Sequence, residues 1–186
     1  MGDRAVDVCL VEACRRGDRE ALRVLFEAYK DRVYSLAIRF TGDEAAAKDI
    51  TQDVFLKLFS HIGQFRGEAE LSTWLYRLVS NACMDEHRRR RRLVPLTGER
   101  VERHREERGP QEIGFARREV RGAVQSAVSE LSPKLRLPIL LRYLEDLSYE
   151  EIATALGCTK GTVASRLNRG HRALARKLAS LRGALP

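Results

Sequence analysis

The last third of the chain gathers basic side chains at a spacing that suits contact with a polyanion. From Ile152 to the C-terminus there is no Asp or Glu, and the basic residues give this stretch a charge of +7. A solvated helix face usually mixes both signs, because opposite charges four residues apart stabilise a helix. A one-signed helix instead favours phosphates and base edges in a DNA groove. The basic residues are Lys160, Arg166, Arg169, Arg172, Arg176, Lys177 and Arg182.

The same stretch carries the pattern of two helices joined by a tight turn. Ser148 and Glu151 form a capping box that begins the first helix, and Gly157 follows its end, where left-handed backbone is needed. Thr159 can cap the second helix. The pattern is typical of a helix-turn-helix, although spacing alone leaves an ordinary corner of two helices open. Inward positions are expected at Ile152, Ala153, Leu156, Val163 and Leu167.

A second basic cluster lies in the middle of the chain. It consists of Arg88, Arg89, Arg90, Arg91 and Arg92. Residues 1–87 carry a net charge of −3, so the +8 of the 186-residue chain comes from two separate places. Two basic clusters on an otherwise acidic chain predict two nucleic-acid contacts rather than one diffuse patch.

The residue types that perform catalysis or hold metals form no recognisable set. The four histidines are scattered, and no H-E-x-x-H or Ser/His/Asp arrangement can be picked out. The four cysteines, Cys9, Cys14, Cys83 and Cys158, show no C-x-x-C spacing and no nearby paired histidines. We therefore expect no enzymatic activity, no metal and no cofactor, and we interpret the cysteines as reduced thiols, with redox sensing as the minor alternative.

Composition limits where the protein can act. At 44% hydrophobic and 32% charged residues, the chain can bury real cores and should be soluble. No charge-free run is long enough to cross a bilayer, and the N-terminal "MGDRAVDVCL" lacks the features of a signal peptide. We expect a cytoplasmic protein without membrane insertion. Because the sequence ends soon after the second basic helix, we also expect no C-terminal regulatory extension.

Helical periodicity runs through both ends of the chain and breaks once, which predicts an all-α fold of two small helical domains. Residues 1–92 and 116–186 keep the spacing of buried helix faces. Residues 93–115 are polar and punctuated by Pro and Gly, which predicts a flexible linker. Caps are expected at Asp18, Asp43 and Ser132, helix ends at Gly17 and Gly42, and a kink or restart at Pro138. Inward positions are expected at Leu22, Leu25, Phe26, Tyr29, Val33, Ala37 and Phe40, at Ala47, Ile50, Val54 and Leu58, at Leu75, Leu78, Val79 and Ala82, and at Val120, Val124 and Val128.

Three segments resemble, in order, the extracytoplasmic-function (ECF) group of bacterial sigma factors. They are "AKDITQDVFLKLF", "FRGEAELSTWLYRLVSNACMDEHRRRRR" and "LSPKLRLPILLRYLEDLSYEEIATALGCTKGTVASRLNRGHRAL". The resemblance implies that residues 1–92 form sigma domain 2, residues 93–115 the linker and residues 116–186 sigma domain 4, which contains the helix-turn-helix. It further implies a factor that directs core RNA polymerase to specific promoters in a stress response, under the control of an anti-sigma factor.

The first segment carries a stripe of residues on the helix that Asp43 begins. The stripe has i, i+3, i+4, i+7 spacing opposite the expected buried face, and its acids and amide suit a partner that bears arginines. The resemblance implies that this stripe binds the clamp helices of the polymerase largest subunit. It also implies that the chain contacts the polymerase flap. A solvated helix face is the alternative, and a metal or acid/base pair lacks a third ligand. The stripe is Asp49, Gln52, Asp53 and Leu56.

The second segment, by the resemblance, recognises and opens the −10 promoter element. The loop at residues 65–71 and Asn81 would frame an unstacked base, while His87 and the arginine run hold the backbone. Primary sigma factors carry two adjacent tryptophans as a wedge where this chain has Arg77 and Leu78, so base capture is expected instead. Trp74 is expected in the core. The −10 residues are Arg66, Gly67, Glu68, Asn81, His87, Arg88, Arg89, Arg90, Arg91 and Arg92.

The third segment, by the resemblance, recognises the −35 element through a helix from Thr159 to about Leu181. The free N–H groups of the first turn also favour phosphate. Position 164, often Arg or Lys in the family, is Ala164 here and can touch only a thymine methyl. The −35 residues are Lys160, Gly161, Thr162, Ser165, Arg166, Asn168 and Arg169.

Two other classes of function stay open at this point. An autonomous repressor or activator could use the same helix-turn-helix as a dimer on a palindrome, but the acidic stripe and the second basic cluster argue against it. An enzyme that acts on nucleic acid would need a catalytic constellation, which the sequence does not offer.

Overall fold

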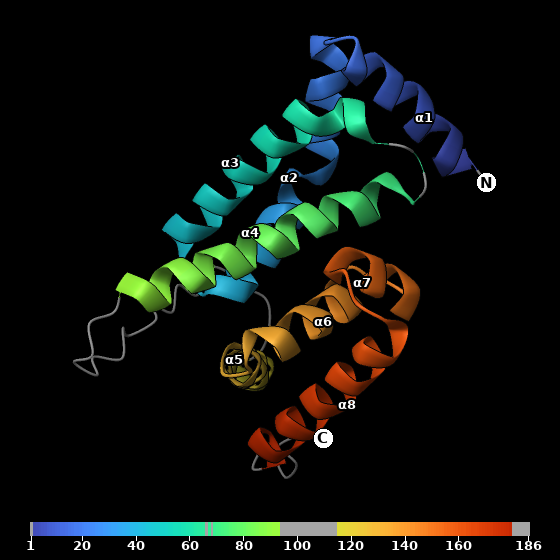
Figure 1. The fold of residues 1–186 in the computed structure, drawn as a ribbon. Helices are drawn as coiled ribbons and strands as arrows, with labels where there is room; N and C mark the ends of the chain where they lie inside the picture. Colours follow the sequence, from blue (N-terminus) through green and yellow to red (C-terminus); the bar gives the residue numbers. More distant parts are fainter. Residues whose placement is uncertain (1, 66, 68, 94–114, 180–186) are drawn as a thin grey trace.

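The computed structural model describes residues 2–65, 67, 69–93 and 115–179, and all regular structure within these ranges is helical. This confirms the all-α prediction. Most of the predicted linker, residues 93–115, lies outside the described residues. The elements in Figure 1 are α1 (Gly2–Arg15), α2 (Arg19–Thr41), α3 (Glu44–His61), the 3-10 turn η1 (Ile62–Gln64), α4 (Leu71–Leu93), α5 (Phe115–Ser129), α6 (Pro133–Leu144), α7 (Tyr149–Leu156) and α8 (Lys160–Lys177).

The N-terminal domain, α1 to α4, is bounded by the predicted caps. The Asp18 carboxylate accepts hydrogen bonds from two backbone N–H groups in the first turn of α2, at 2.8 and 3.2 Å. Gly42 ends that helix with φ at 68°, in the left-handed region that glycine adopts without a side-chain clash. Asp43 then accepts from the Ala46 N–H at 2.8 Å and begins α3. These three predictions are confirmed.

The core of this domain lies between α2, α3 and α4. Most of the expected inward positions are buried. Four are only half-buried against the core, namely Leu22, Phe26, Tyr29 and Leu78. Trp74 is also half-buried against the core, with its ring 5.5 Å from that of Phe65. The buried positions are Leu25, Val33, Ala37, Phe40, Ala47, Ile50, Val54, Leu58, Leu75, Val79 and Ala82.

The C-terminal domain, α5 to α8, contains the predicted helix-turn-helix in α7 and α8. Both hydrogen bonds of the capping box are present, from the Ser148 N–H to Glu151 at 2.7 Å and from the Glu151 N–H to Ser148 at 3.2 Å. Gly157 makes the turn with φ at 59°, and the Thr159 hydroxyl caps α8. Val163 is completely buried, as the helix-turn-helix pattern requires.

Three local predictions for α5 and α6 need correction. Val124 is 39% exposed, because α5 turns Ala127, about 60° around the helix, into the core. Of the two outcomes expected at Pro138, the restart is wrong, because α6 continues through the residue; the kink stays a prediction. Pro133 occupies the first turn of α6 as expected, but the Ser132 side chain makes no cap hydrogen bond to the described residues.

The two domains pack against each other, with α4 lying along α7 and α2 against α6 (Figure 1). The sequence did not predict this contact. Within the described part of the chain, no helix combines the length and apolar character needed to span a bilayer.

Candidate functional site

The predicted stripe on α3 points away from the core. Its four residues, Asp49, Gln52, Asp53 and Leu56, are all exposed, and the neighbouring Ile50 and Val54 are buried. Leu56, the last residue of the stripe, is 57% exposed and adds an apolar side chain to an otherwise polar face. The structure therefore brings the stripe together as one continuous surface.

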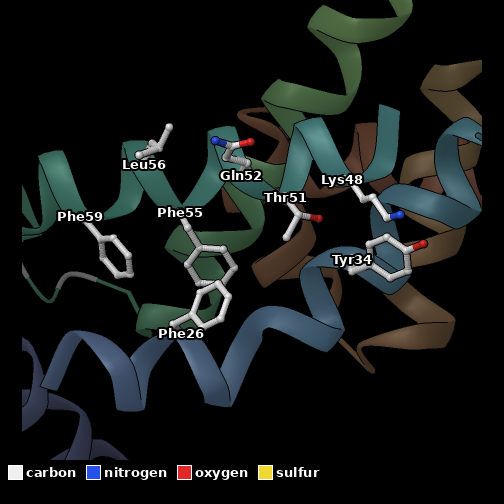
Figure 2. A pocket seen from close by; sticks show the side chains of 8 residues that line it. All are labelled: Phe26, Tyr34, Lys48, Thr51, Gln52, Phe55, Leu56 and Phe59. Carbon is white, nitrogen blue, oxygen red and sulfur yellow. The ribbon is translucent and has the colours of Figure 1, made fainter. Parts of the chain in front are cut away.

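An apolar groove that the sequence analysis missed lies beside this stripe, between α2 and α3 (Figure 2). Phe26 of α2 meets Phe55 of α3 edge to face, with ring centroids 4.7 Å apart, and Phe59 extends the aromatic floor at 5.9 Å from Phe55. Phe55 and Phe59, four residues apart, could have signalled it. The groove shares two residues with the stripe; its lining is Phe26, Tyr34, Lys48, Thr51, Gln52, Phe55, Leu56 and Phe59.

The predicted −10 residues are carried by α4 and the loop before it. Asn81 is exposed on α4, and His87 is half-buried two turns later. Gly67 is exposed with φ at 71°, a backbone conformation that favours glycine. Arg66 and Glu68 lie outside the described residues.

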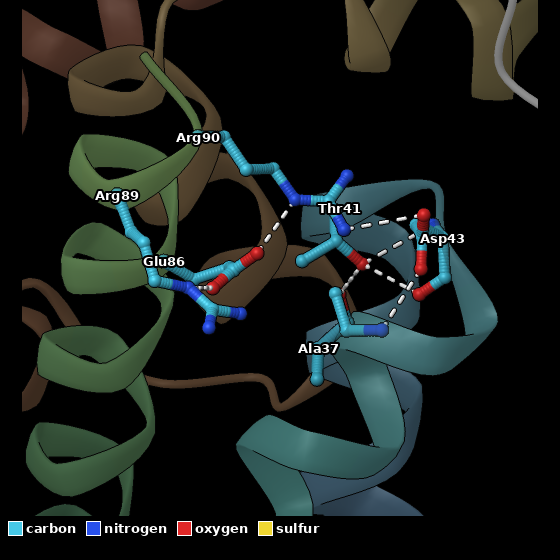
Figure 3. A network of polar contacts seen from close by, with 7 residues as sticks. Ala37, Thr41, Asp43, Glu86, Arg89 and Arg90 are labelled. Carbon is cyan, nitrogen blue, oxygen red and sulfur yellow. Dashed lines mark hydrogen bonds and ion pairs between the residues drawn. The ribbon is translucent and has the colours of Figure 1, made fainter. Parts of the chain in front are cut away.

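The five arginines at the end of α4 divide into two groups. Arg88 pairs with Asp85 at 2.5 Å, and Arg89 pairs with Glu86 at 2.7 Å. Arg90 bonds Glu86 at 2.6 Å and reaches Asp43 at 3.2 Å, so it links α4 to the start of α3 (Figure 3). The remaining two, Arg91 and Arg92, are exposed in the last turn.

The acids in this network have perturbed ionisation. Burial raises the pKa of Glu86, but hydrogen bonds from Arg90 and Arg89 outweigh that effect and leave it below its ordinary value. The pKa of Asp43 is lowered first by the hydrogen bond from the Ala46 N–H and also by Arg90. Both carboxylates are therefore held in the charged form.

The seven predicted −35 residues lie together on the first three turns of α8. Asn168 and Gly161 are exposed, and Arg169 folds along the helix to bond Ser165 Oγ at 3.2 Å. Lys160 pairs with Glu150 of α7, so its ammonium is held at the start of the helix. The other two are less free: the Thr162 hydroxyl lies 2.9 Å from that of Thr159, and the Arg166 guanidinium approaches Cys158 Sγ at 3.8 Å.

The structure adds nothing that suggests metal chemistry in the part of the chain it describes, where no cluster of three or more His, Cys, Asp or Glu residues could hold an ion. The surfaces that stand out are instead one acidic and apolar face on α3 and one basic face on α8. Such faces suit binding to a protein partner and to a polyanion.

Comparison with known proteins places both faces within described families. Residues 25–93 match the family model "Sigma-70 region 2", and residues 121–174 match "Sigma-70, region 4". The RNA polymerase sigma-H factor of Pseudomonas aeruginosa is 34% identical over 183 residues, which cover 94% of this chain and 95% of that one. The ECF RNA polymerase sigma-E factor of Escherichia coli is 32% identical over 192 residues, with 97% and 98% covered.

Solved structures show the same fold. The sigma factor RpoE in complex with the anti-sigma factor NepR from Bartonella quintana superposes with a TM-score of 0.72 at 23% identity, covering 84% of this chain and 96% of that one. CnrH, solved in complex with the cytosolic domain of CnrY, gives a TM-score of 0.71 at 22% identity, with 94% and 97% covered.

Proposed function

The chain belongs to the ECF group of RNA polymerase sigma factors, and we propose which of its surfaces bind core polymerase and which bind the promoter. As a sigma factor, it directs core polymerase to promoters and initiates transcription. The assignment depends on one observation: the acidic surface and the basic surface lie on different domains. The exposed acidic stripe lies on α3 in the region 2 match, and the one-signed basic helix α8 lies in the region 4 match.

Core polymerase, in this proposal, binds the α3 stripe and the groove beside it. Asp49 and Asp53 offer carboxylates to basic side chains of the clamp helices, which gives the encounter its charge complementarity. The groove beneath Leu56 supplies apolar area that can be fully desolvated, as hot spots in protein interfaces require. The flap of polymerase would bind the C-terminal domain.

The −10 element is proposed to lie along α4. Asn81 can both donate to and accept from the edge of a base that has left the stack. Arg91 and Arg92 are exposed at the end of the same helix and suit phosphate contacts. Arg88, Arg89 and Arg90 are partly used within the protein, so we expect a smaller DNA contribution from them.

The −35 element is proposed to lie against the start of α8. Lys160, at the N-terminus of the helix, is placed for a phosphate, where unpaired backbone N–H groups add to its charge. Asn168 and Arg169 are exposed a little more than two turns later, where side chains can reach base edges in the major groove.

Regulation by an anti-sigma factor is part of the proposal, because RpoE of Bartonella quintana, which shares this fold, was solved in complex with the anti-sigma factor NepR. A protein that binds core polymerase acts in the cytoplasm, so the proposal places the chain there. The proposal requires no catalytic activity of the sigma factor itself. The autonomous repressor is not favoured by the relatives found.

Run-off transcription with purified core polymerase on a library of promoter sequences tests the proposal. The chain should support initiation from a subset of sequences that share two elements at a fixed spacing. A chain that binds a palindromic site tightly without polymerase, and supports no initiation with it, would instead be a repressor.

A further inference from the structure

The loop between η1 and α4 is held at its start by a residue from α1. The Nη2 group of Arg15 donates a hydrogen bond to the carbonyl oxygen of Phe65, which lies 50 residues further along the chain. This carbonyl belongs to the peptide that joins Phe65 to residue 66. Because a peptide is planar, a bond to its oxygen helps to fix the plane in which the chain enters the loop. Arg15 therefore acts on the course of the loop from a different helix.

Arg15 is oriented by its own helix. Its Nη1 group donates to the carboxylate of Glu12, one turn earlier on α1. A planar guanidinium can bond a carboxylate and a carbonyl at once, because its donors form a rigid fork. The Arg15 side chain is 32% exposed, whereas Val11 and Cys14 bury α1 in the core at 4% and 3% exposure. The attachment of α1 to the domain therefore does not depend on Arg15.

Other contacts hold the two ends of the loop. The Phe65 ring lies 5.5 Å from the ring of Trp74 in the first turn of α4, and the Phe65 N–H donates to the Ile62 carbonyl at 3.2 Å. At the far end, Leu71 begins α4 and is 1% exposed. Between these ends Gly67 is exposed, with φ at 71°. An exposed loop of this kind keeps its position through the contacts at its ends.

The resemblance places base capture at this loop. Residues 65–71 and Asn81 are predicted to frame an unstacked base of the −10 element. Extruding a base costs free energy, and a pocket offsets that cost best when its walls are in place before the base arrives. Asn81 is placed by the α4 helix, whereas the loop is placed by its anchors. The bond from Arg15 to Phe65 is one of these anchors, and it comes from outside the segment that contacts DNA.

We propose that Arg15 is a positioning residue for base capture, which acts through the Phe65 carbonyl to hold the loop opposite Asn81 and so strengthens the preference for one base of the −10 element. The part that concerns the promoter rests on the proposed function, whereas the contact between Arg15 and the loop does not. In this proposal Arg15 touches no DNA, unlike the arginines at the end of α4.

Fluorescence of Trp74 measures the contact without polymerase or DNA. It is the single tryptophan of the chain, and it is half-buried beside Phe65. Arg15→Ala should free the start of the loop, raise the acrylamide quenching constant of Trp74 and shift its emission to longer wavelength. The melting temperature should be nearly unchanged, because the core is untouched. Arg16→Ala removes the same charge at the next exposed position and should leave the fluorescence unchanged.

Glu12→Ala is a second variant that leaves Arg15 in place. It removes the carboxylate that orients the guanidinium, so Arg15 can still donate to the Phe65 carbonyl but is less constrained. The quenching constant of Trp74 should rise in the same direction as in Arg15→Ala and by a smaller amount. This variant changes the net charge in the opposite sense, so a shared direction would not come from charge alone.

The effect on base capture is measured with polymerase holoenzyme on a promoter found by run-off transcription. Each base of the −10 element is changed in turn, and the ratio of initiation from the preferred and the changed base gives the preference at that position. Arg15→Ala should lower this ratio roughly fivefold at one position, as expected for one lost hydrogen bond, and leave the −35 preferences unchanged. In a chain that already carries Asn81→Ala, adding Arg15→Ala should change little, because both act on the same base.

Salt dependence separates positioning from direct contact with DNA. Arg15→Ala should leave the slope of log affinity against log salt unchanged, whereas loss of a phosphate contact lowers the slope by about one. Three results would overturn the proposal: unchanged quenching of Trp74 in Arg15→Ala, an unchanged −10 preference, or a uniform loss of initiation with a lowered salt slope. Failure to find any promoter would count against the proposed function, and the Trp74 measurement would still decide whether Arg15 holds the loop.

Discussion

Arg90, in the arginine run at the end of α4, reaches Asp43, the cap of α3, at 3.2 Å (Figure 3). Its guanidinium also bonds Glu86 at 2.6 Å, one turn earlier on its own helix. A residue that the sequence assigned to the DNA backbone therefore joins two helices of the N-terminal domain. The neighbouring Arg91 is exposed, and we propose that it contacts DNA phosphates instead.

Substitution separates these two roles. Arg90→Ala should lower the free energy of unfolding by about 1 kcal/mol, since its ion pair with Asp43 is two-fifths exposed on both sides and partly screened. Arg91→Ala should leave stability unchanged and lower the salt dependence of DNA binding by about one unit of slope. Urea unfolding and binding titrations at several salt concentrations measure both. Equal effects of the two substitutions on stability would show that Arg90 has no structural role.

The lowered pKa values of Asp43 and Glu86 predict how stability depends on pH. A carboxylate with a lower pKa in the folded state stabilises the fold fully above its ordinary pKa, near 4, and loses that contribution as the pH falls through the folded value. The melting temperature should therefore be flat above about pH 5 and fall below about pH 4. Asp43→Asn keeps a cap but cannot titrate, so its melting temperature should fall less steeply in acid. Circular dichroism melts across this range decide the point.

Features that depend on neighbouring residues could be predicted from the sequence, whereas contacts between residues far apart in the chain could not. Caps such as Asp18 and Thr159 were predictable because a cap bonds backbone two or three residues away. The Tyr76 hydroxyl of α4 donates to the carboxylate of Glu145 at the end of α6, 69 residues further along the chain, and no spacing rule predicts such a contact. The role of Arg90 was hidden for the same reason, because its partner Asp43 comes from another helix. The prediction that Val124 faces inward was wrong. It followed the regular spacing of three valines and overlooked Ala127, whose small side chain lets the helices approach.

The polymerase contact can be tested by reversing one charge. Asp53→Arg places a cation in the α3 stripe, where a basic partner would be repelled, and should weaken core binding by several kcal/mol. The residue is exposed and makes no contribution to the core, so the helical content and melting temperature should be unchanged. Asp31→Arg, an equal charge change at an exposed position on α2, is the control and should bind normally. Unchanged affinity of Asp53→Arg in a pull-down with core would disprove the assignment.

The start of α8 should determine preference within the −35 element. If Arg169 makes a bidentate contact with a guanine, Arg169→Ala should cost about 1–3 kcal/mol on the preferred promoter and relax discrimination at one position. Arg172→Ala, one turn further on and also exposed, should weaken all promoters by a similar and smaller factor. Initiation measured across the promoter library distinguishes the two patterns. A uniform loss for Arg169→Ala would reassign it to the backbone.

Asn81 is predicted to act after the DNA has opened. It is exposed on α4 and is not part of the core, so Asn81→Ala should fold normally and form the closed complex with unchanged affinity. If its amide holds a base that has left the stack, the substitution should impair strand opening, because only the extruded base gains from the contact. Permanganate reactivity of unpaired thymines should fall on a duplex promoter, and transcription from a pre-melted bubble should be at least partly restored. A bubble that restores nothing, or a defect already present in the closed complex, would mean that Asn81 does not capture a base.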